Sequence, residues 1–493
     1  MLSLKHINIK SFNENIAYLN KNCIEYAIED ISSLSQVEVQ TETSKIYAFL
    51  QIVEDDNLVA PTELGLNEEA FADLGETDGS EVTISIAAPA PSRTALKRKI
   101  GGNILSPQDY KFIIKDIINR RYSNIDIASF IVAGGTFISA NEVLSLTEAL
   151  VNNTRINWPH DSIVVDHHCM GGVPGNKTDI IVSAIVGAYG LLMPKTVSKA
   201  TTSCASVADT MGIMCNVNLT HKRFLELAEN NKSVIANYEP LDMAEAVKSI
   251  ANVERHLGLT QQEFLLTSIL ALKISAGVTH LLIDIPVGEK SRIKSAYEAI
   301  RLRKLAEYVG DRLGVEIEVV MTDGREPIGN GVGAVLEARD VVQVLKNKPQ
   351  APQDLMEKSL FLAGRILEFD PKLRGGKGYD IATDILQSGQ AFEKLNEMIR
   401  SQGKKEQPVL GTFTRDIMAH QSGEITEIDN QQINRIGIWA GVRQYTGAGI
   451  DLFKKIGDMV NTGEPLYRIY ACTQEDLDLA ESVVENSNGY TIR

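Results

Sequence analysis

The 493-residue sequence contains few cysteines, and they show no pairing motif. The five are Cys23, Cys169, Cys204, Cys215 and Cys472, an odd number with no C-x-x-C spacing. Disulfide frameworks and structural zinc sites need paired cysteines at short, regular spacings. The sequence therefore argues against both and favours a reducing compartment.

Long apolar runs are also missing. The longest one, Ile180–Pro194, is interrupted by Ser183 and Gly187 and is too short to span a bilayer. Residues Met1–His6 show no charged region followed by an apolar stretch. We therefore expect a cytoplasmic protein with no membrane partner.

The sequence has no excess of positive charge. It contains 49 Lys and Arg residues against 64 Asp and Glu residues, a net charge of −15. Nonspecific nucleic-acid binding depends on neutralising phosphates, so a nucleic-acid partner is not expected. A small anionic ligand remains possible, because local backbone amides and a few cations can hold it.

The length and the 44% hydrophobic content predict a globular protein with several domains. The expected domains are an N-terminal β-rich domain (1–90), a helical lobe (91–160 and 253–276), an α/β lobe (161–252 and 277–404) and a C-terminal β-rich domain (405–493).

Local patterns support the first two domains. Lys45–Val53 and Ser80–Ala87 read as strands, and the proline-containing run Ala88–Ser92 reads as a stiff linker. A helix is predicted to begin at Ser106-Pro107. Two further helices, 123–133 and 139–151, are expected on either side of a break at Gly134-Gly135.

The α/β lobe shows buried strands that alternate with helices. Residues 163–165, 279–286 and 315–321 read as strands, and Asp179–Tyr189 reads as an apolar helix. This order predicts a mainly parallel sheet with its ligand site at the carboxyl ends of the strands.

A glycine-rich loop joins the first of these strands to the apolar helix. In Gly171–Thr178 the glycines would let the backbone approach a ligand, and the helix N-terminus would offer free N–H groups. Lys177 could add charge and Thr178 a hydroxyl. The alternative is a tight turn without a ligand, and the P-loop spacing is absent.

A second polar loop follows a buried helix. Lys195–Ser203 contains two lysines and five hydroxyls, which either bind a ligand or cap the local backbone. Two such loops in one lobe favour phosphate or ribose binding.

The pair His167-His168 suggests a metal site, but the pattern does not support one. Adjacent residues on a strand point to opposite faces, and no carboxylate cluster accompanies the two rings. We expect no metal and interpret the histidines as core, hydrogen-bonding or catalytic residues.

Ordered motifs from about Val82 onward resemble those of the thymidine phosphorylase and AMP phosphorylase family, particularly its long branch with an extra N-terminal β domain. The matching stretches are Leu96–Gly102, Val165–Thr178, Ser198–Ser203, Ala208–Met211, Val253–Arg255, Thr279–Gly288, Ile328–Asp340, Ile385–Gly389 and Ile428–Asn430. The resemblance implies an α/β multidomain protein of the nucleoside phosphorylase type II fold, with a helical lobe and a mainly parallel α/β lobe between the two β-rich domains.

The resemblance also implies an activity. Family members cleave the N-glycosidic bond of a nucleoside or nucleotide with inorganic phosphate and release the free base and a 1-phosphosugar. They use no metal or organic cofactor and form dimers. We therefore expect a pentosyltransferase whose substrates are inorganic phosphate and a nucleoside or nucleoside 5′-monophosphate. We also expect it to be a homodimer.

The residues and the resemblance together give a candidate site. The phosphate or nucleotide positions are Gly172, Lys177, Thr178, Ser198, Lys199, Ala200, Thr201, Thr202 and Ser203. The base or sugar positions are Ser268, Lys273 and Arg292. The catalytic positions are His167, His168 and Thr260, where Thr260 takes the place of the family's acidic proton donor.

Several of these positions depart from the family's residues. His167 stands where the family has a phosphate-binding lysine, and Lys199 where it has an arginine. Val197 and Val207 replace two hydroxyl positions. Exchanging an ammonium for imidazole near phosphate costs roughly 1.5–3 kcal/mol of charge-assisted hydrogen bonding.

Three functions therefore stay open. The first is phosphorolysis with altered specificity. The second is a catalytically inactive member that binds a nucleotide-like ligand. The third is an N-glycosyl hydrolase or base-exchange enzyme in which His167 or His168 acts as base.

Overall fold

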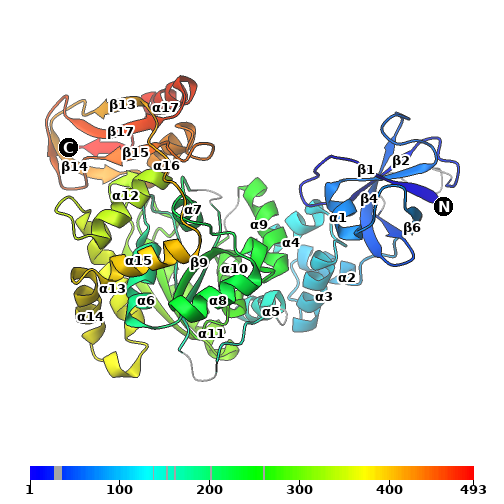
Figure 1. Ribbon diagram of the computed structural model, residues 1–493, viewed down its shortest axis with the longest axis horizontal. Helices are drawn as coiled ribbons and strands as arrows, with labels where there is room; N and C mark the ends of the chain where they lie inside the picture. Colours follow the sequence, from blue (N-terminus) through cyan, green and yellow to red (C-terminus); the bar gives the residue numbers. More distant parts are fainter. Residues whose placement is uncertain (27–35, 137, 152–153, 160–162, 200–202, 259–260) are drawn as a thin grey trace. The chain divides into compact units, whose positions relative to one another are not determined.

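The computed structural model describes residues 1–26, 36–136, 138–151, 154–159, 163–199, 203–258 and 261–493 (Figure 1). The backbone divides into two compact units. The first consists of Met1–Leu150 and Glu245–Thr267, and the second of Val151–Ala244 and Ser268–Arg493. Within the described residues, no helix has the length and apolar character needed to cross a membrane.

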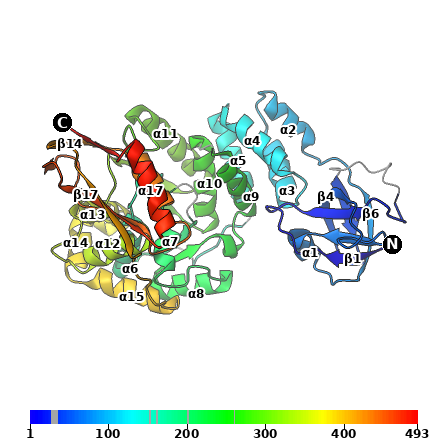
Figure 2. The same ribbon diagram turned by 90° about the horizontal axis from the view of Figure 1, so that it is seen from above.

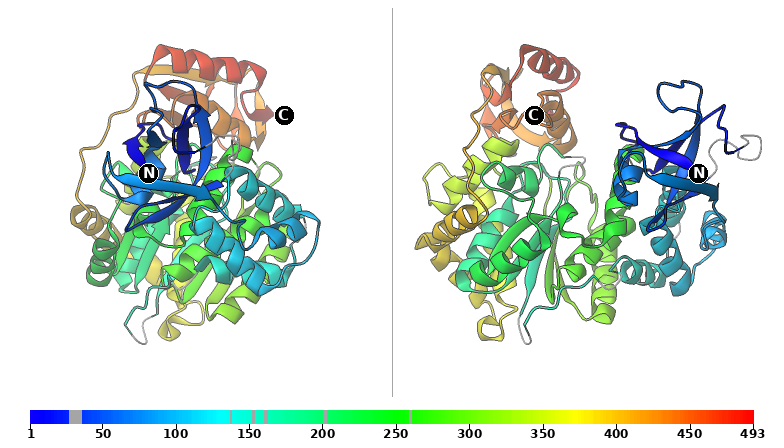
Figure 3. Two further views of the ribbon diagram at one scale, coloured as in Figure 1. Left: turned by 90° about the vertical axis from the view of Figure 1, so that its right-hand side faces the viewer. Right: turned by 45° about the vertical axis from the view of Figure 1, so that its right-hand side comes forward.

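The first unit begins with a closed six-stranded β-barrel (blue in Figure 3). The strands, in barrel order, are β1 (Leu2–His6), β5 (Glu63–Leu66), β2 (Ile16–Asn20), β4 (Lys45–Val53), β3 (Gln36–Gln40) and β6 (Glu81–Ile86), with the helix α1 (Glu68–Leu74) between β5 and β6. Leu19, Val37 and Leu64 lie in its core. Closure leaves no free strand edge, and the strands expected at 45–53 and 80–87 are confirmed.

Helices make up the rest of the first unit. They are α2 (Arg93–Ile100), α3 (Pro107–Ile118), α4 (Asn124–Thr136), α5 (Ala140–Val151) and α9 (Glu245–Leu257), followed by α10 (Gln262–Ser275), which passes into the second unit. α3 begins directly after Ser106, as predicted, and Ser106 and Asp109 form a capping box in front of it. α9 packs its apolar side on α3 and α4, and the segment that returns to this unit runs from Glu245 to Thr267.

The predicted helix break at Gly134-Gly135 is wrong, because α4 continues through both glycines. A Cβ atom at Gly134 would lie 2.3 Å from Cε2 of Phe264, and one at Gly135 would lie 1.2 Å from Oε1 of Gln261. These glycines permit close packing against the start of α10 and do not end the helix.

The second unit contains a parallel sheet. Strands β11 (Glu316–Asp323), β10 (His280–Val287) and β7 (Val165–Cys169) pair in parallel, as do β8 (Met193–Val197) and β9 (Ser233–Asn237). A parallel bridge between Val164 and Leu192 connects the two sets. β10 is buried along most of its length, as expected for a strand covered on both faces.

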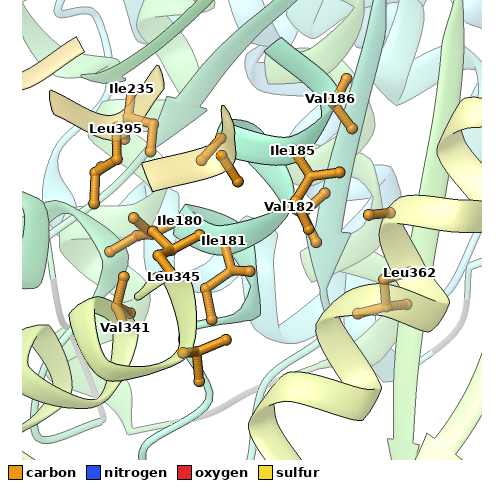
Figure 4. Close-up of a cluster of buried hydrophobic side chains, with 14 of the residues drawn as sticks. Ile180, Ile181, Val182, Ile185, Val186, Ile235, Val341, Leu345, Leu362 and Leu395 are labelled. Atoms are coloured by element: carbon orange, nitrogen blue, oxygen red, sulfur yellow. The ribbon is translucent and has the colours of Figure 1, made fainter. Parts of the chain in front are cut away.

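Helix α6 (Thr178–Tyr189) lies in the centre of this unit. Its residues from Thr178 to Gly187 are all buried, and Ile181, Ile185 and Val186 belong to the main core (Figure 4). The other elements of this part are α7 (Val207–Gly212), α8 (His221–Asn231), η2 (Glu239–Leu241), α11 (Ala296–Leu313), α12 (Ala334–Leu345), α13 (Gln353–Leu367), η3 (Pro371–Leu373), α14 (Lys377–Gln387) and α15 (Gln390–Ser401). The core thus surrounds a helix whose first turn lies beside the glycine-rich loop.

The C-terminal part combines two antiparallel sheets with two helices. The sheets have the orders β12-β15-β17-β13 and β16-β14-β18, and α17 packs on β13 and β17 (Figure 2). The elements are β12 (Gly331–Val332), β13 (Phe413–Met418), β14 (Gly423–Ile428), α16 (Asn430–Trp439), β15 (Gly449–Leu452), β16 (Met459–Val460), β17 (Pro465–Ala471), α17 (Gln474–Asn486) and β18 (Tyr490–Ile492). β12 lies outside the expected 405–493 segment. It pairs with β15 and so joins the C-terminal part to the α/β part.

Candidate active site at the carboxyl edge of the sheet

The carboxyl ends of the parallel strands bring the candidate loops to one edge of the sheet. β7 ends at Cys169, β8 at Val197 and β10 at Val287. The glycine-rich loop follows β7, and Ser198 and Lys199 follow β8 with exposed side chains. In open parallel sheets this edge is where ligands bind.

The glycine-rich loop packs closely against two neighbouring segments. Gly172 has φ +91°, and a Cβ atom there would lie 2.4 Å from the backbone nitrogen of Arg292. Gly175 has φ +73°, and a Cβ there would lie 2.4 Å from the carbonyl oxygen of Ile328. Nη1 of Arg292 donates to the carbonyl of Met170 at 3.1 Å. The structure therefore brings together Arg292 and the loop, which the sequence assigned to separate subsites.

Lys177 does not have the arrangement expected of a phosphate ligand. Its ammonium is buried, 3.1 Å from Oε2 of Glu337, and it donates to the carbonyl of Ala205 at 3.3 Å. Thr210 donates to the same Glu337 oxygen at 2.6 Å. The assignment of Lys177 to phosphate binding stays a prediction, and an internal carboxylate already pairs with its charge.

Four charged side chains form a buried network behind the loop. Nζ of Lys273 lies 2.6 Å from Oδ2 of Asp166, and Nζ of Lys195 lies 3.2 Å from Oδ1 of the same residue. Lys195 also lies 2.7 Å from Oδ1 of Asp179, which sits in the first turn of α6. Lys273, assigned from the sequence to base or sugar binding, is thus an interior partner of Asp166.

The two histidines of β7, which the sequence analysis proposed as catalytic, are close to this network. Nδ1 of His167 lies 2.5 Å from Oδ1 of Asp179, and its side chain is fully buried. His168 is partly buried, and burial together with the charges of Lys273 and Lys195 holds its pKa well below the usual value. The imidazole of His168 is therefore neutral near pH 7.

The network also shifts the pKa values of its own members. Burial would raise the pKa of Asp179, but Lys195 and His167 hold it well below its usual range. Burial would lower the pKa of Lys195, but Asp166 and Asp179 raise it. Burial lowers the pKa of Lys273 to about 8, although Asp166 opposes this effect. Asp179 and Lys195 are therefore charged near pH 7, and Lys273 is mostly so.

The pKa of Lys273 leads to a prediction for alkaline stability. The pKa of Lys273 is about 8 in the folded chain and 10.5 in the unfolded chain. Between these two pH values, Lys273 carries more protons in the unfolded chain than in the folded chain. The contribution of Lys273 to the free energy of unfolding should therefore rise with pH, by roughly 1 kcal/mol per pH unit. Urea unfolding of the unmodified protein and Lys273→Met from pH 7.5 to 9.5 measures it. A stability difference that does not change with pH would contradict the prediction.

The remaining predicted residues are more scattered. Thr178 donates to Oδ1 of Asn176 at 3.0 Å, and Ser203 donates to the carbonyl of Ala205 at 3.3 Å, which is local capping. Ser268 is buried on α10. Three positions of the second loop and one catalytic position lie outside the described residues: Ala200, Thr201, Thr202 and Thr260.

Sequence reasoning gave no role to Asp179 or Glu337. Each stands at one end of an apolar run: Ile180-Ile181-Val182 follows Asp179, and Val335-Leu336 precedes Glu337. Charged residues are almost never fully buried unless they are paired. A single charged residue in a helix predicted to be buried therefore indicates that it has a charged partner. The partners could not be identified, because they come from distant segments. Across the described residues, no cluster of three His, Cys, Asp or Glu side chains could hold a metal ion.

Comparisons with known proteins show which family the chain resembles. A family model described as "Pyrimidine nucleoside phosphorylase C-terminal domain" matches residues 424–491. A protein of Albidiferax ferrireducens is 46% identical, with 100% of this chain and 95% of that protein aligned. One of Methylococcus capsulatus is 43% identical, over 100% and 96% of the two chains. Both carry the name "Putative thymidine phosphorylase".

A solved structure has a similar fold over part of the chain. Anthranilate phosphoribosyltransferase from Thermus thermophilus superimposes with a TM-score of 0.53 and covers 62% of this chain and 98% of its own, at 19% sequence identity. The relatives match from end to end at more than 40% identity, and the glycine-rich loop stands at the carboxyl edge of the sheet. The chain belongs to the thymidine phosphorylase family.

Proposed function

We propose that this protein transfers the pentosyl group of a nucleoside or nucleoside 5′-monophosphate to phosphate, releasing free base and a 1-phosphosugar. The observation that carries the proposal is the end-to-end similarity to relatives named as thymidine phosphorylases. We propose that the reaction uses no metal or organic cofactor. We also propose that the protein is a homodimer in solution.

The carboxyl edge offers groups suited to this reaction. Breaking the N-glycosidic bond passes through an oxocarbenium-like state, which requires an anion beside the anomeric carbon and a hydrogen-bonded departing base. In the proposal, the N-terminal turn of α6, Arg292 and the exposed Lys199 hold phosphate, with Gly172, Ser198 and Ser203 close to it. The neutral imidazole of His168 accepts a hydrogen bond from the substrate.

A panel of nucleosides and nucleoside 5′-monophosphates, incubated with the purified protein, tests the proposal. Free base and a 1-phosphosugar should appear only when inorganic phosphate is present. An active thymidine phosphorylase serves as the control for each substrate. No base release on the whole panel, with the control active, would reject the proposal and leave an inactive, ligand-binding member of the family.

A second candidate is cleavage by water in place of phosphate. It is favoured by the carboxylate of Asp179, which lies in the first turn of α6, where a helix attracts anions. The negative charge of Asp179 disfavours a bound phosphate. Lys177 and Lys195 are paired with carboxylates, so fewer cations are available to bind phosphate. Base release without phosphate, yielding free pentose, would identify this reaction.

A further inference from the structure

The segment that follows β8 ends in the core of the C-terminal part. Cys204 comes directly after Ser203, the last residue of the second predicted ligand loop. Its side chain is 5% exposed and belongs to the same apolar cluster as Ile433 and Ile450. The end of the predicted ligand loop is therefore enclosed by residues that come from far outside the parallel sheet.

Helix α16 makes two contacts with Cys204. The thiol donates to the carbonyl of Asn434 at 3.2 Å. Three residues further along the helix, a Cβ atom at Gly437 would lie 2.5 Å from Sγ of Cys204. Glycine weakens the interior of a helix relative to alanine, so its presence in α16 needs a packing reason. The close approach of the Cys204 thiol provides that reason.

The same face of α16 holds a second segment at this edge of the sheet. Nδ2 of Asn430, a side chain with 1% exposure, donates to the carbonyl of Gly324 at 2.8 Å. Gly324 directly follows β11. Positions 430, 434 and 437 have the i, i+4, i+7 spacing that places residues on one side of a helix. One face of α16 therefore contacts the segments that follow two of the parallel strands, β8 and β11.

The residues next to Cys204 connect this contact to the glycine-rich loop. The carbonyl of Ala205 accepts hydrogen bonds from Nζ of Lys177 and from the hydroxyl of Ser203, both at 3.3 Å. Ser206 then forms the N-cap of α7. A displacement of Cys204 would therefore move the acceptor of groups from both predicted ligand loops.

We propose that Cys204 and Gly437 are positioning residues, through which α16 fixes the predicted ligand loop at Ser203 and so supports phosphate binding. This inference rests on the proposed pentosyl transfer and gives the C-terminal part a role in it. Ser198 and Lys199, at the start of the loop, have exposed side chains, whereas its end is held by the core. Neither positioning residue needs to touch the substrate.

Gly437→Ala tests the contact with the smallest possible change. Alanine forms helices more readily than glycine, so α16 itself is not weakened. The new Cβ atom instead forces the thiol of Cys204 away from the carbonyl of Asn434. We expect KM for phosphate to rise roughly tenfold or more, while kcat and KM for the nucleoside change less than about threefold.

Cys204→Ala provides the rescue. Alone, it removes a weak S–H donor and should raise KM for phosphate about threefold. In the double variant, the Cβ atom at position 437 would lie 3.8 Å from Cβ of residue 204, which is an ordinary contact. The double variant should therefore have the KM of Cys204→Ala. A KM that Gly437→Ala does not raise, or that the double variant does not restore, would overturn the inference.

Gly310→Ala is the matched control for a general loss of stability. Gly310 also lies inside a helix, α11, and a Cβ atom there would lie 2.6 Å from Cδ1 of Ile317. Ile317 stands near the start of β11, at the opposite end of the strand from the ligand loops. This variant should lower the melting temperature and leave KM for phosphate unchanged. An increase in KM equal to that of Gly437→Ala would overturn the inference.

Calorimetry with inorganic phosphate separates the inference from the proposed function, because it needs no turnover. A phosphate Kd that Gly437→Ala raises and the double variant restores would support the inference, even if complete absence of base release rejected the proposed function. Base release with unchanged KM and Kd for phosphate in Gly437→Ala would overturn the inference alone. Absence of phosphate binding by the unmodified protein would overturn both.

Discussion

Replacing Lys273 by methionine is expected to lower the free energy of unfolding of the second unit by about 3–5 kcal/mol. The ammonium is buried and lies 2.6 Å from Asp166, whose side chain has 0% exposure. Removing one partner leaves the carboxylate with Lys195 alone and strands its Oδ2 atom in the interior. Urea unfolding at pH 7, with fluorescence and circular dichroism as probes, measures the loss.

Two controls show whether the loss comes from the broken pair. Lys222→Met removes an exposed lysine in α8 and should change stability by less than about 0.5 kcal/mol. Lys273→Met combined with Asp166→Leu removes both charges and should recover much of the loss. A single variant as stable as the unmodified protein would show that the pair contributes little.

Replacing Gly172 by alanine is expected to reduce base release by about 100-fold or more. The new Cβ atom would lie 2.4 Å from the backbone nitrogen of Arg292, so one of the two segments must move. A displacement near 1 Å at a reacting centre costs on the order of 10²-fold in rate. Steady-state kinetics on the best substrate of the panel measures this effect.

Gly190→Ala is the matched control for this change. Gly190 ends α6 with φ +107°, and no atom would lie within 4 Å of a new Cβ. Both variants carry the strain of an alanine at positive φ, about 1–3 kcal/mol, but only Gly172→Ala meets a neighbouring backbone. Equal activity of the two variants would show that the close approach at Gly172 is not needed for catalysis.

The elements predicted correctly are those with local causes. The strand at Lys45–Val53 has the predicted bounds, and α3 starts directly after Ser106. Alternation of apolar residues and capping by a serine depend on residues a few positions apart, so the sequence contains them directly. The same holds for β10 and α6, whose apolar runs mark buried elements.

Predictions failed where distant segments decide the structure. Gly134 and Gly135 resemble a helix break, but packing against Phe264 and Gln261 keeps α4 continuous. For Lys177, a predicted phosphate ligand, only the structure shows that Glu337 pairs with it in the interior. In each case the deciding contact joins residues more than a hundred positions apart, which no local pattern records.

The sequence by itself determined the family, the order of strands and helices, and the position of the glycine-rich loop before α6, because periodicity, caps and motifs are local properties. Only the tertiary structure decided which charges are available to a ligand. It paired Lys273 and Lys195 with Asp166, and Lys195 and His167 with Asp179. Ion pairs in a low-dielectric interior depend on distances that arise only when the strands and helices pack together.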